Sequence, residues 1–352
     1  MKSFKNNNFN HYKKKIDNFF SKVNKISKKH PIITVIVMHE YFRNIYPGDT
    51  FIKNKYSTDR LKNFQLALSN LEKIVDSFIK IGNYNFNFNL KKKVNTQTLF
   101  GKLWNTRFED FSLDQKNFLN KLLKKLDFDT KKIKNKLVLD MGCGSGRFSV
   151  AFARLGAKKV YGIDLGDEGL KIGKKIAKKF NVKNVKFKKS SVLKTSFKSN
   201  YFDFVFCKGV LHHTGNLKDS LNEFLRLIKP NGYGFLYLYG KGGVFWYSRK
   251  KMRQIMKNIP YSFSIKILKL LGMPAERTVF VDSWYVPIED HVSKNYLENF
   301  FKKNKLIFKK STKNALPIEL ESMSKNKNFE LLYGDGEHRY LVRKNIKIEK
   351  SN

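Results

Sequence analysis

The sequence predicts an α/β fold with a doubly wound parallel sheet, and three observations support this prediction. Between residues 136 and about 240, apolar strand-like segments alternate with helical ones. A turn with three alternating glycines, residues 142–146, joins the first strand to the first helix. The second strand ends in an acid, Asp164. Alternation of this kind gives parallel strands joined by right-handed crossovers, with helices on both faces of the sheet.

The elements of this core follow from the pattern in order. Asn216 can cap the third helix at Leu217, because an asparagine side chain can accept a hydrogen bond from the first helical turn. The tetrapeptide 229–232, Lys-Pro-Asn-Gly, contains residues that end a helix. Strands are expected near residues 137–140, 159–164, 185–187, 202–207 and 233–239, and helices near 147–155, 167–180 and 217–228.

The glycine turn and its acidic neighbours indicate the kind of cofactor. Arg147 stands where a G-x-G-x-x-G dinucleotide fingerprint would have its third glycine, and the Gly-Lys-Ser/Thr of a P-loop does not follow. Asp140, just before the turn, would repel a pyrophosphate but suits a ligand that carries an ammonium and a sulfonium. Asp164 can accept both hydroxyls of a ribose. These features favour S-adenosylmethionine over a dinucleotide.

These motifs resemble the class I S-adenosylmethionine-dependent methyltransferases, and among them the group that includes ubiquinone-type and sugar or natural-product methyltransferases. The resemblance covers residues 136 to about 240 and rests on residues 138–147 (VLDMGCGSGR), Asp164, 202–213 (FDFVFCKGVLHH) and 229–234 (KPNGYG). It implies a Rossmann-like, seven-stranded sheet that ends in an antiparallel hairpin. Residues 307–310 and 338–343 are the candidate sixth and seventh strands.

The resemblance also implies which residues contact the cofactor. Many relatives carry an Asp after the third strand that contacts the adenine amine, whereas this chain has Ser191 and Val192 there. The hydroxyl of Ser191 or the backbone of Val192 would have to make that contact, and Arg147 could reach the methionine carboxylate. The expected set is Asp140, Gly142, Cys143, Gly144, Ser145, Gly146, Arg147, Asp164, Leu165, Ser191, Val192, Lys208 and Gly209.

The expected reaction is methyl transfer to an oxygen of a small or carrier-bound metabolite. The enzyme must hold the acceptor in line with the sulfur–methyl bond and keep water out. A hydroxyl acceptor also benefits from a general base, although a histidine in these positions can equally serve packing or loop order. The candidates are His212 and His213 after the fourth strand, His291 beside Glu289 and Asp290 in a later loop, and, more weakly, Tyr239 and Asp282.

The charge leaves other classes of function open. The net charge is +42, but only 11 of the 71 basic residues are arginine, the residue best suited to phosphate and base recognition. A low-GC genome would produce the same excess of Lys, Asn, Ile and Phe. An RNA or protein methyltransferase is the first alternative, and it predicts lysines gathered at the pocket mouth. A non-catalytic protein with this fold and a dinucleotide enzyme are less favoured, and no metal-ligand spacing is present.

The rest of the chain is expected to be mostly helical. Helical spacing is found over residues 61–81, 113–126, 245–256 and 262–271, and residues 83–90 alternate as a strand would. Phe100, Trp104 and Phe108 could form a lid over the cofactor or belong to the core. The expected segments are a basic amphipathic stretch (1–30), a helical extension (31–135), the cofactor core (136–240), a substrate-side insertion (241–305) and the hairpin with a tail (306–352).

The N-terminal stretch offers a choice between docking and membrane contact. Ile16, Phe19, Phe20, Val23 and Ile26 recur at helical spacing among lysines. Such a stripe can pack on the protein, the favoured interpretation, or lie on an anionic membrane through residues 13–29. The apolar run 31–38 is too short to span a bilayer. Two isolated cysteines suit a reducing cytoplasm, which is therefore the expected location, with or without peripheral membrane contact.

Overall fold

The computed structural model describes residues 2–45, 60–81, 95–97, 99–101, 115–272, 283–310 and 328–345. The chain forms two compact units. Unit 1 contains residues 1–94, 241–286 and 316–336, and unit 2 contains residues 95–240, 287–315 and 337–352. These boundaries differ from the expected ones. Residues 95–135 fold with the cofactor core, and the expected insertion 241–305 divides after Val286.

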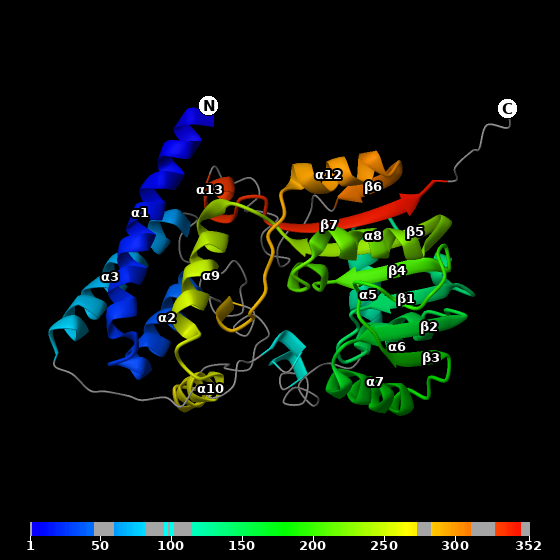
Figure 1. The fold of residues 1–352 in the computed structure, drawn as a ribbon, viewed down its shortest axis with the longest axis horizontal. Coiled ribbons are helices and arrows are strands. Elements are labelled where there is room, and N and C mark those ends of the chain that lie inside the picture. The colour runs from blue at the N-terminus through cyan, green and yellow to red at the C-terminus, as the bar shows by residue number, and fades with distance from the viewer. Residues whose placement is uncertain are drawn as a thin grey trace. The chain divides into compact units, whose positions relative to one another are not determined.

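Unit 2 is built on a seven-stranded sheet of order β3-β2-β1-β4-β5-β7-β6 (Figure 1). The first five strands are parallel, and β7 pairs antiparallel with both β5 and β6. This confirms the expected Rossmann-like sheet with its antiparallel hairpin. The strands are β1 (Leu137–Met141), β2 (Lys159–Asp164), β3 (Val185–Lys189), β4 (Phe202–Lys208), β5 (Ile228–Tyr239), β6 (Leu306–Lys310) and β7 (Glu337–Lys344).

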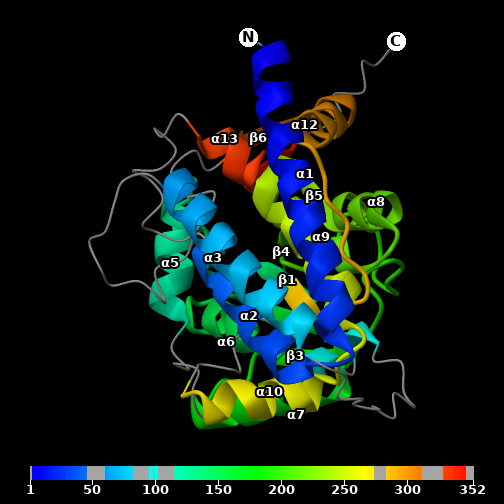
Figure 2. The same cartoon turned by 90° about the vertical axis from the view of Figure 1, so that its left-hand side faces the viewer.

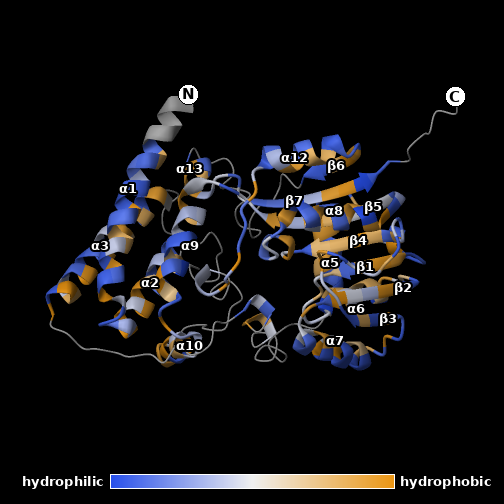
Figure 3. Ribbon diagram, viewed as in Figure 1, coloured by the Kyte–Doolittle hydropathy of each residue, from blue (hydrophilic) through white to orange (hydrophobic). Residues whose placement is uncertain are grey.

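Helices cover both faces of this sheet, as a doubly wound fold requires. One face packs against α6 (Arg147–Arg154) and α7 (Asp167–Lys179), with α5 (Lys116–Lys124) against α6. The other packs against α8 (Leu217–Leu227) and α12 (Lys294–Lys303). Figure 3 shows the apolar residues concentrated in the central strands. Because side chains alternate along a strand, Leu139 faces α8 whereas its neighbour Asp140 faces α6.

The ends of two elements depart from the expected ones. Helix α8 begins after Asn216, whose side chain accepts from the amide of Asp219, so the expected cap is confirmed. The helix ends at Leu227, and β5 starts at Ile228 rather than near residue 233. The Lys-Pro-Asn-Gly segment therefore belongs to an irregular start of β5, where the register with β4 shifts between Phe202 and Phe204. The short turns η1 (Thr130–Ile133) and η2 (Leu211–His213) precede β1 and follow β4.

Unit 1 is helical and draws on distant parts of the sequence. It contains α1 (Lys2–Ser27), α2 (Pro31–Ile45), α3 (Arg60–Lys80), α9 (Gly243–Met256), α10 (Tyr261–Leu270) and α13 (Phe329–Tyr333). Figure 2 shows α1, α2 and α3 side by side, and α1 also packs on α9. Tyr247 and Lys251 of α9 both contact Asp17 of α1, at 2.6 Å and 2.5 Å. Polar contacts thus join elements more than 200 residues apart.

The apolar stripe of α1 is packed inside unit 1. Ile16, Phe19 and Val23 are fully buried, and the rings of Phe19 and Phe20 lie against Tyr41 of α2. Docking therefore accounts for the stripe, and the alternative of membrane contact through residues 13–29 is corrected, because its apolar side chains are covered. Among the described helices, none combines the length and the apolar character needed to cross a bilayer.

Candidate active site

The order of the strands locates the site. The chain runs outward from β1 to β3 and then returns to place β4 on the other side of β1. At such a switch point the loops after the two central strands diverge and leave a crevice at the carboxyl edge of the sheet. The loop after β1 is the glycine turn. Strand β4 ends at Lys208, and the loop after it carries Gly209 and the two histidines. The sequence motifs therefore meet at one edge.

The glycine turn is held in a conformation that favours glycine. Gly142, Gly144 and Gly146 have φ values of 79°, 51° and 71°, in the region that other residues rarely adopt. The amides of Gly142 and Cys143 both donate to the carbonyl of Ile163 at 2.8 Å, which ties the turn to β2. Gly146 then caps α6, so the turn presents the backbone at the N-terminus of that helix.

Asp140 is buried on the α6 side of the sheet. Its Oδ2 accepts a hydrogen bond from the hydroxyl of Ser149 at 2.6 Å, and the residue is only 2% exposed. Burial raises the pKa of Asp140 to about 7, and the nearby charge of Asp164 acts in the same direction. From the sequence, Asp140 was expected to present a negative charge to the ligand. The structure instead shows a carboxyl group that is held against α6 and whose pKa is close to neutral pH.

Asp164 ends β2 and organises the two loops beside it. Its Oδ2 accepts from the amide of Gly144, and its Oδ1 accepts from the amide of Gly166, both at 2.8 Å. Burial raises the pKa of Asp164 while these backbone amides oppose the rise. Each carboxylate oxygen has a second lone pair, so the group can still accept ribose hydroxyls. Asp164 therefore connects the glycine turn to the edge where a ribose would lie.

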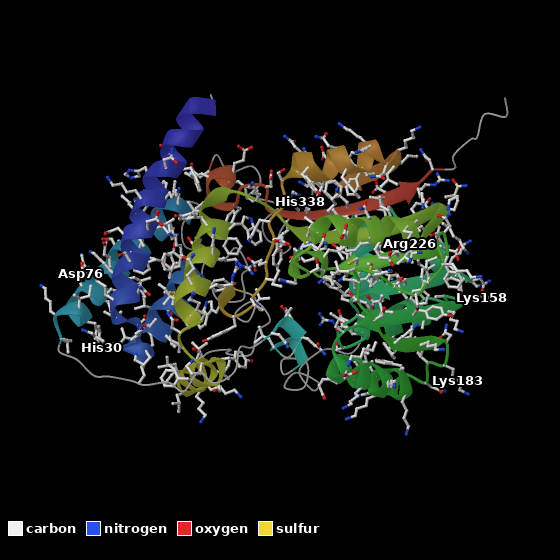
Figure 4. All side chains as sticks on the ribbon, in the orientation of Figure 1. His30, Asp76, Lys158, Lys183, Arg226 and His338 are labelled. Atoms are coloured by element: carbon white, nitrogen blue, oxygen red, sulfur yellow. The ribbon has the colours of Figure 1, made fainter. Side chains whose placement is uncertain are left out.

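The loop after β3 is fixed by a partly buried ion pair that the sequence did not reveal. Oε1 of Glu223 accepts from both the amide and the hydroxyl of Thr195, each at 2.7 Å, and Arg226 makes two further bonds to the same carboxylate. Ser191 accepts from the amide of Leu193, and Val192 is buried. The residues expected near an adenine therefore sit on a loop clamped from α8. Figure 4 labels Arg226 there.

Residues 95–97 and 99–101 extend from the loop after β2 to the loop after β4. Nε2 of Gln97 donates to the carbonyl of Leu165 at 2.8 Å, and the ring of Phe100 lies 5.7 Å from that of His213. This position fits the expected lid at Phe100. Trp104 and Phe108, the other expected lid residues, lie outside the described residues. Gln97 carries no motif, so only the structure could identify it.

The other expected cofactor residues occupy the same edge. Gly209 has a φ of 74°, and its amide donates to the carbonyl of Tyr237. The ammonium of Lys208 lies over the rings of Phe148 and Tyr237, 5.5 Å from each centroid. Arg147 opens α6 with its guanidinium over the ring of Phe148. Basic and aromatic side chains therefore alternate between the glycine turn and the end of β5.

Residues 288–292 form an extended strap across the carboxyl ends of β4 and β5. The amide of Asp290 donates to the carbonyl of His212 at 2.7 Å, and that of Val292 donates to the carbonyl of Tyr239 at 3.2 Å. Nε2 of His338, on β7, donates to the carbonyl of Val292 at 2.8 Å. The strap is therefore held by three different strands or their loops, and it carries His291 into the same edge.

The three histidines have different surroundings. His212 is fully buried, and its ring stacks on Tyr239 at 3.9 Å. His213 is partly exposed, and its Nδ1 donates to the carbonyl of Ile288 at 2.8 Å. In His291, Nδ1 donates to the carbonyl of Gly240 at 2.8 Å, and Nε2 lies 2.9 Å from Oε1 of Glu289. A carbonyl can only accept, so the neutral ring of His213 carries its lone pair on Nε2.

The structure thus brings together residues that are far apart in the sequence. Tyr239 contacts His212, His213 and His291 through its ring. The weaker base candidate Asp282 lies outside the described residues. Over the described part of the chain, no group of three or more His, Cys, Asp or Glu side chains is arranged to hold a metal ion. Cys143 and Cys207 are buried free thiols whose pKa values are raised by burial.

Comparison with known proteins agrees with this geometry. Residues 132–257 match the family model described as a methyltransferase domain. The ubiquinone biosynthesis O-methyltransferase of Acinetobacter baumannii (strain ACICU) is 31% identical over 150 residues, which cover 42% of this chain and 62% of that protein. An uncharacterized protein of Rickettsia prowazekii (strain Madrid E) is 32% identical over 136 residues, 38% of this chain and 54% of that one. The chain thus spans just over half the length of these relatives.

Two solved structures are similar to part of this chain at lower identity. PKMT2 from Rickettsia typhi is 18% identical with a TM-score of 0.48, over 68% of this chain and 55% of that one. The YcgJ protein from Bacillus subtilis is 16% identical with a TM-score of 0.42. The match covers 64% of this chain and 99% of that protein. The sheet order and the glycine turn define a Rossmann-like cofactor-binding fold. The matched family model covers residues 132–257, so this part of the chain is similar to a methyltransferase domain.

Proposed function

We propose that this protein transfers the methyl group of S-adenosylmethionine to an oxygen of a small or carrier-bound metabolite, with His213 as the general base. The observation that carries the proposal is the hydrogen bond from Nδ1 of His213 to the carbonyl of Ile288. It assigns the lone pair to Nε2 on a partly exposed ring next to the switch point. A lone pair held in one direction is what proton removal from a hydroxyl requires.

The residues at this edge fit the cofactor. When bound, S-adenosylmethionine supplies a methyl group already activated by the sulfonium. The glycine turn allows the backbone to approach the ligand, and Asp164 offers carboxylate oxygens to a ribose. Gln97 and Phe100 sit over the same edge and help to exclude water. The residues of the protein position the acceptor and remove its proton.

The other two histidines are less suited to the role of base. His212 is buried in a ring stack. Both ring nitrogens of His291 are engaged, one by a carbonyl and the other by a carboxylate. A base must reach the acceptor proton within hydrogen-bond distance. Among the three, the surroundings of His213 best satisfy this requirement.

The distribution of lysine supports a metabolite rather than a polymer as acceptor. Exposed lysines occur on α1, α5, α7, α10 and α12 and on the strands β3 and β6. Figure 4 labels Lys158 and Lys183 at the outer edge of unit 2, away from the switch point. A surface that guides a nucleic acid would gather its charge around the site. Lysines spread over many elements are instead expected from the lysine-rich composition of the whole chain.

The test is transfer of labelled methyl from S-adenosylmethionine by the full chain into a lysate of the source cells. The lysate is then fractionated into RNA, protein, lipid and small molecules. Label is expected in the lipid or small-molecule fraction. His213→Asn should lower it by about 100-fold, in the range of a lost general base, with unchanged affinity for S-adenosylhomocysteine. His11→Asn, an exposed histidine of α1, is the matched control.

Two results would contradict the proposal. Label in nuclease-sensitive material, or on the amino acids of digested protein, would replace the metabolite by a polymer. Undiminished label with His213→Asn would remove His213 from the role of base while leaving methyl transfer itself in place.

A further inference from the structure

The pair formed by Glu289 and His291 must hold a proton between its two side chains. Nδ1 of His291 donates to the carbonyl of Gly240, so Nδ1 is protonated. Its Nε2 lies 2.9 Å from a carboxylate oxygen of Glu289, whose side chain is fully buried. Two lone pairs do not approach that closely, so a proton lies between Nε2 and Oε1, on one partner or the other. The contact is therefore a closed hydrogen bond.

This bond fixes the strap at the residue next to Ile288. The carbonyl of Ile288 belongs to the peptide bond that leads into Glu289, and a peptide bond is planar. The side chain of Glu289 is tied through His291 to Gly240, at the end of β5. The amide of Asp290 is tied to His212. The direction of the Ile288 carbonyl is consequently set by anchors on both following residues.

We propose that Glu289 is a positioning residue for His213. The bond between Glu289 and His291 holds the strap so that the Ile288 carbonyl accepts from Nδ1 of His213, which keeps the lone pair of His213 on Nε2. The inference rests on the proposed role of His213, because the tautomer matters only if Nε2 takes the acceptor proton. It assigns to Glu289 a function through the strap and not through contact with cofactor or acceptor.

The experiment is nitrogen NMR of the full chain labelled at histidine, which distinguishes the two tautomers of each ring. The chain has seven histidines, and the signal of His213 is identified by its loss in His213→Asn. The wild-type signal is expected to be that of the Nδ1–H form. Glu289→Ala should convert it to a mixture of both tautomers. Glu289→Gln should restore the single form, because an amide can still hydrogen-bond to His291.

Controls separate this effect from general loss of structure. Glu298→Ala removes a different carboxylate of unit 2, a partly buried one that accepts from Tyr340 at 3.0 Å, and should leave the tautomer of His213 unchanged. If Glu289→Ala does not fold, His291→Asn tests the same link from the other side. A merely structural role would lower stability without moving the tautomer signal.

The two proposals can fail separately. A single Nδ1–H signal for His213 in both Glu289→Ala and His291→Asn would overturn the positioning role, whatever the activity of the His213 variant. Full methyl transfer by His213→Asn would instead overturn the role of base. The tautomer measurement would then still report whether the strap controls the ring.

Discussion

The glycine turn and the strap border the same edge of the sheet but are built in different ways. The turn, residues 142–146, depends on backbone conformations that glycine favours, and its contacts run to the adjacent strand β2. The strap, residues 288–292, contains no residue with a positive φ. It is held by hydrogen bonds to residues 46 to 78 positions away. The turn is therefore determined by a local sequence motif, whereas the strap is determined by tertiary contacts.

Substitutions in the turn and in the strap should therefore affect different properties of the protein. A change in the turn alters the local backbone, so its effect should appear in cofactor affinity. A change at an anchor of the strap alters one hydrogen bond among several, so its effect on stability should be smaller.

The first prediction concerns the carboxyl group just before the turn. Because burial raises the pKa of Asp140 from 3.8 to about 7, the folded state binds more protons than the unfolded one between these values. The free energy of unfolding should therefore fall as pH rises from about 4 to about 7, by up to about 4 kcal/mol from this group. Asp140→Asn should remove that part of the slope in urea unfolding measured from pH 4 to 8.

The control for this prediction is Asp167→Asn, which alters an exposed carboxylate paired with Lys189. It should leave the pH slope as in the wild type. A slope shared by Asp140→Asn and the wild type would mean that Asp140 is ionised in the folded protein at pH 5.

The second prediction concerns the turn itself. Gly144→Val places a β-branched residue at a φ of 51°, which costs roughly 1–2 kcal/mol for the backbone alone and pushes a side chain toward the ligand. The affinity for S-adenosylhomocysteine, measured by calorimetry, should fall by about 100-fold, or about 3 kcal/mol. Gly156→Val is the matched control, because Gly156 has a φ of 87° at the far end of α6. It should lower stability but keep the affinity, and equal losses for both variants would refute a specific role of the turn.

These regions also differ in how far the sequence could predict them. The five parallel strands and the edge that carries Asp164 follow from local alternation and turn residues, whereas the sixth and seventh strands were expected from the family resemblance. The cap at Asn216 was predicted to the residue. The strap, Gln97 and the clamp of Glu223 were not, because each depends on contacts set by the tertiary fold. Helix α12 was missed as well, since the expected insertion ran through it. The stripe of α1 indicated a helix but could not name its partner.

The third prediction concerns the clamp on the loop after β3. Burial raises the pKa of Glu223, but hydrogen bonds from Arg226 and Thr195 outweigh it, so the pKa lies below 4.5. The stabilising contribution of this carboxylate is thus complete above about pH 4.5 and is lost as pH falls through the lowered pKa. At pH 7, Glu223→Gln should cost about 2 kcal/mol, the value of hydrogen bonds to a charged group, and should also weaken S-adenosylhomocysteine binding.

Glu168→Gln provides the comparison for this clamp. Glu168 pairs with Lys171 on the exposed surface of α7, and exposed pairs contribute well under about 1 kcal/mol. Urea unfolding at pH 7 should therefore separate the two variants clearly. Equal stability of Glu223→Gln and the wild type would show that the loop after β3 does not depend on its contact with α8.

The smallest expected effect belongs to an anchor of the strap. His338 is fully buried on β7 and donates from Nε2 to the carbonyl of Val292. His338→Phe keeps the ring volume but leaves that carbonyl without this donor, which should cost about 1–2 kcal/mol in urea unfolding. Tyr340→Phe removes a hydrogen bond to Glu298 from the same strand and is the matched control. Because His291 and Asp290 still hold the strap, S-adenosylhomocysteine affinity should stay unchanged in His338→Phe. A loss of affinity as large as that of Gly144→Val would mean that the strap, like the turn, directly shapes the cofactor site.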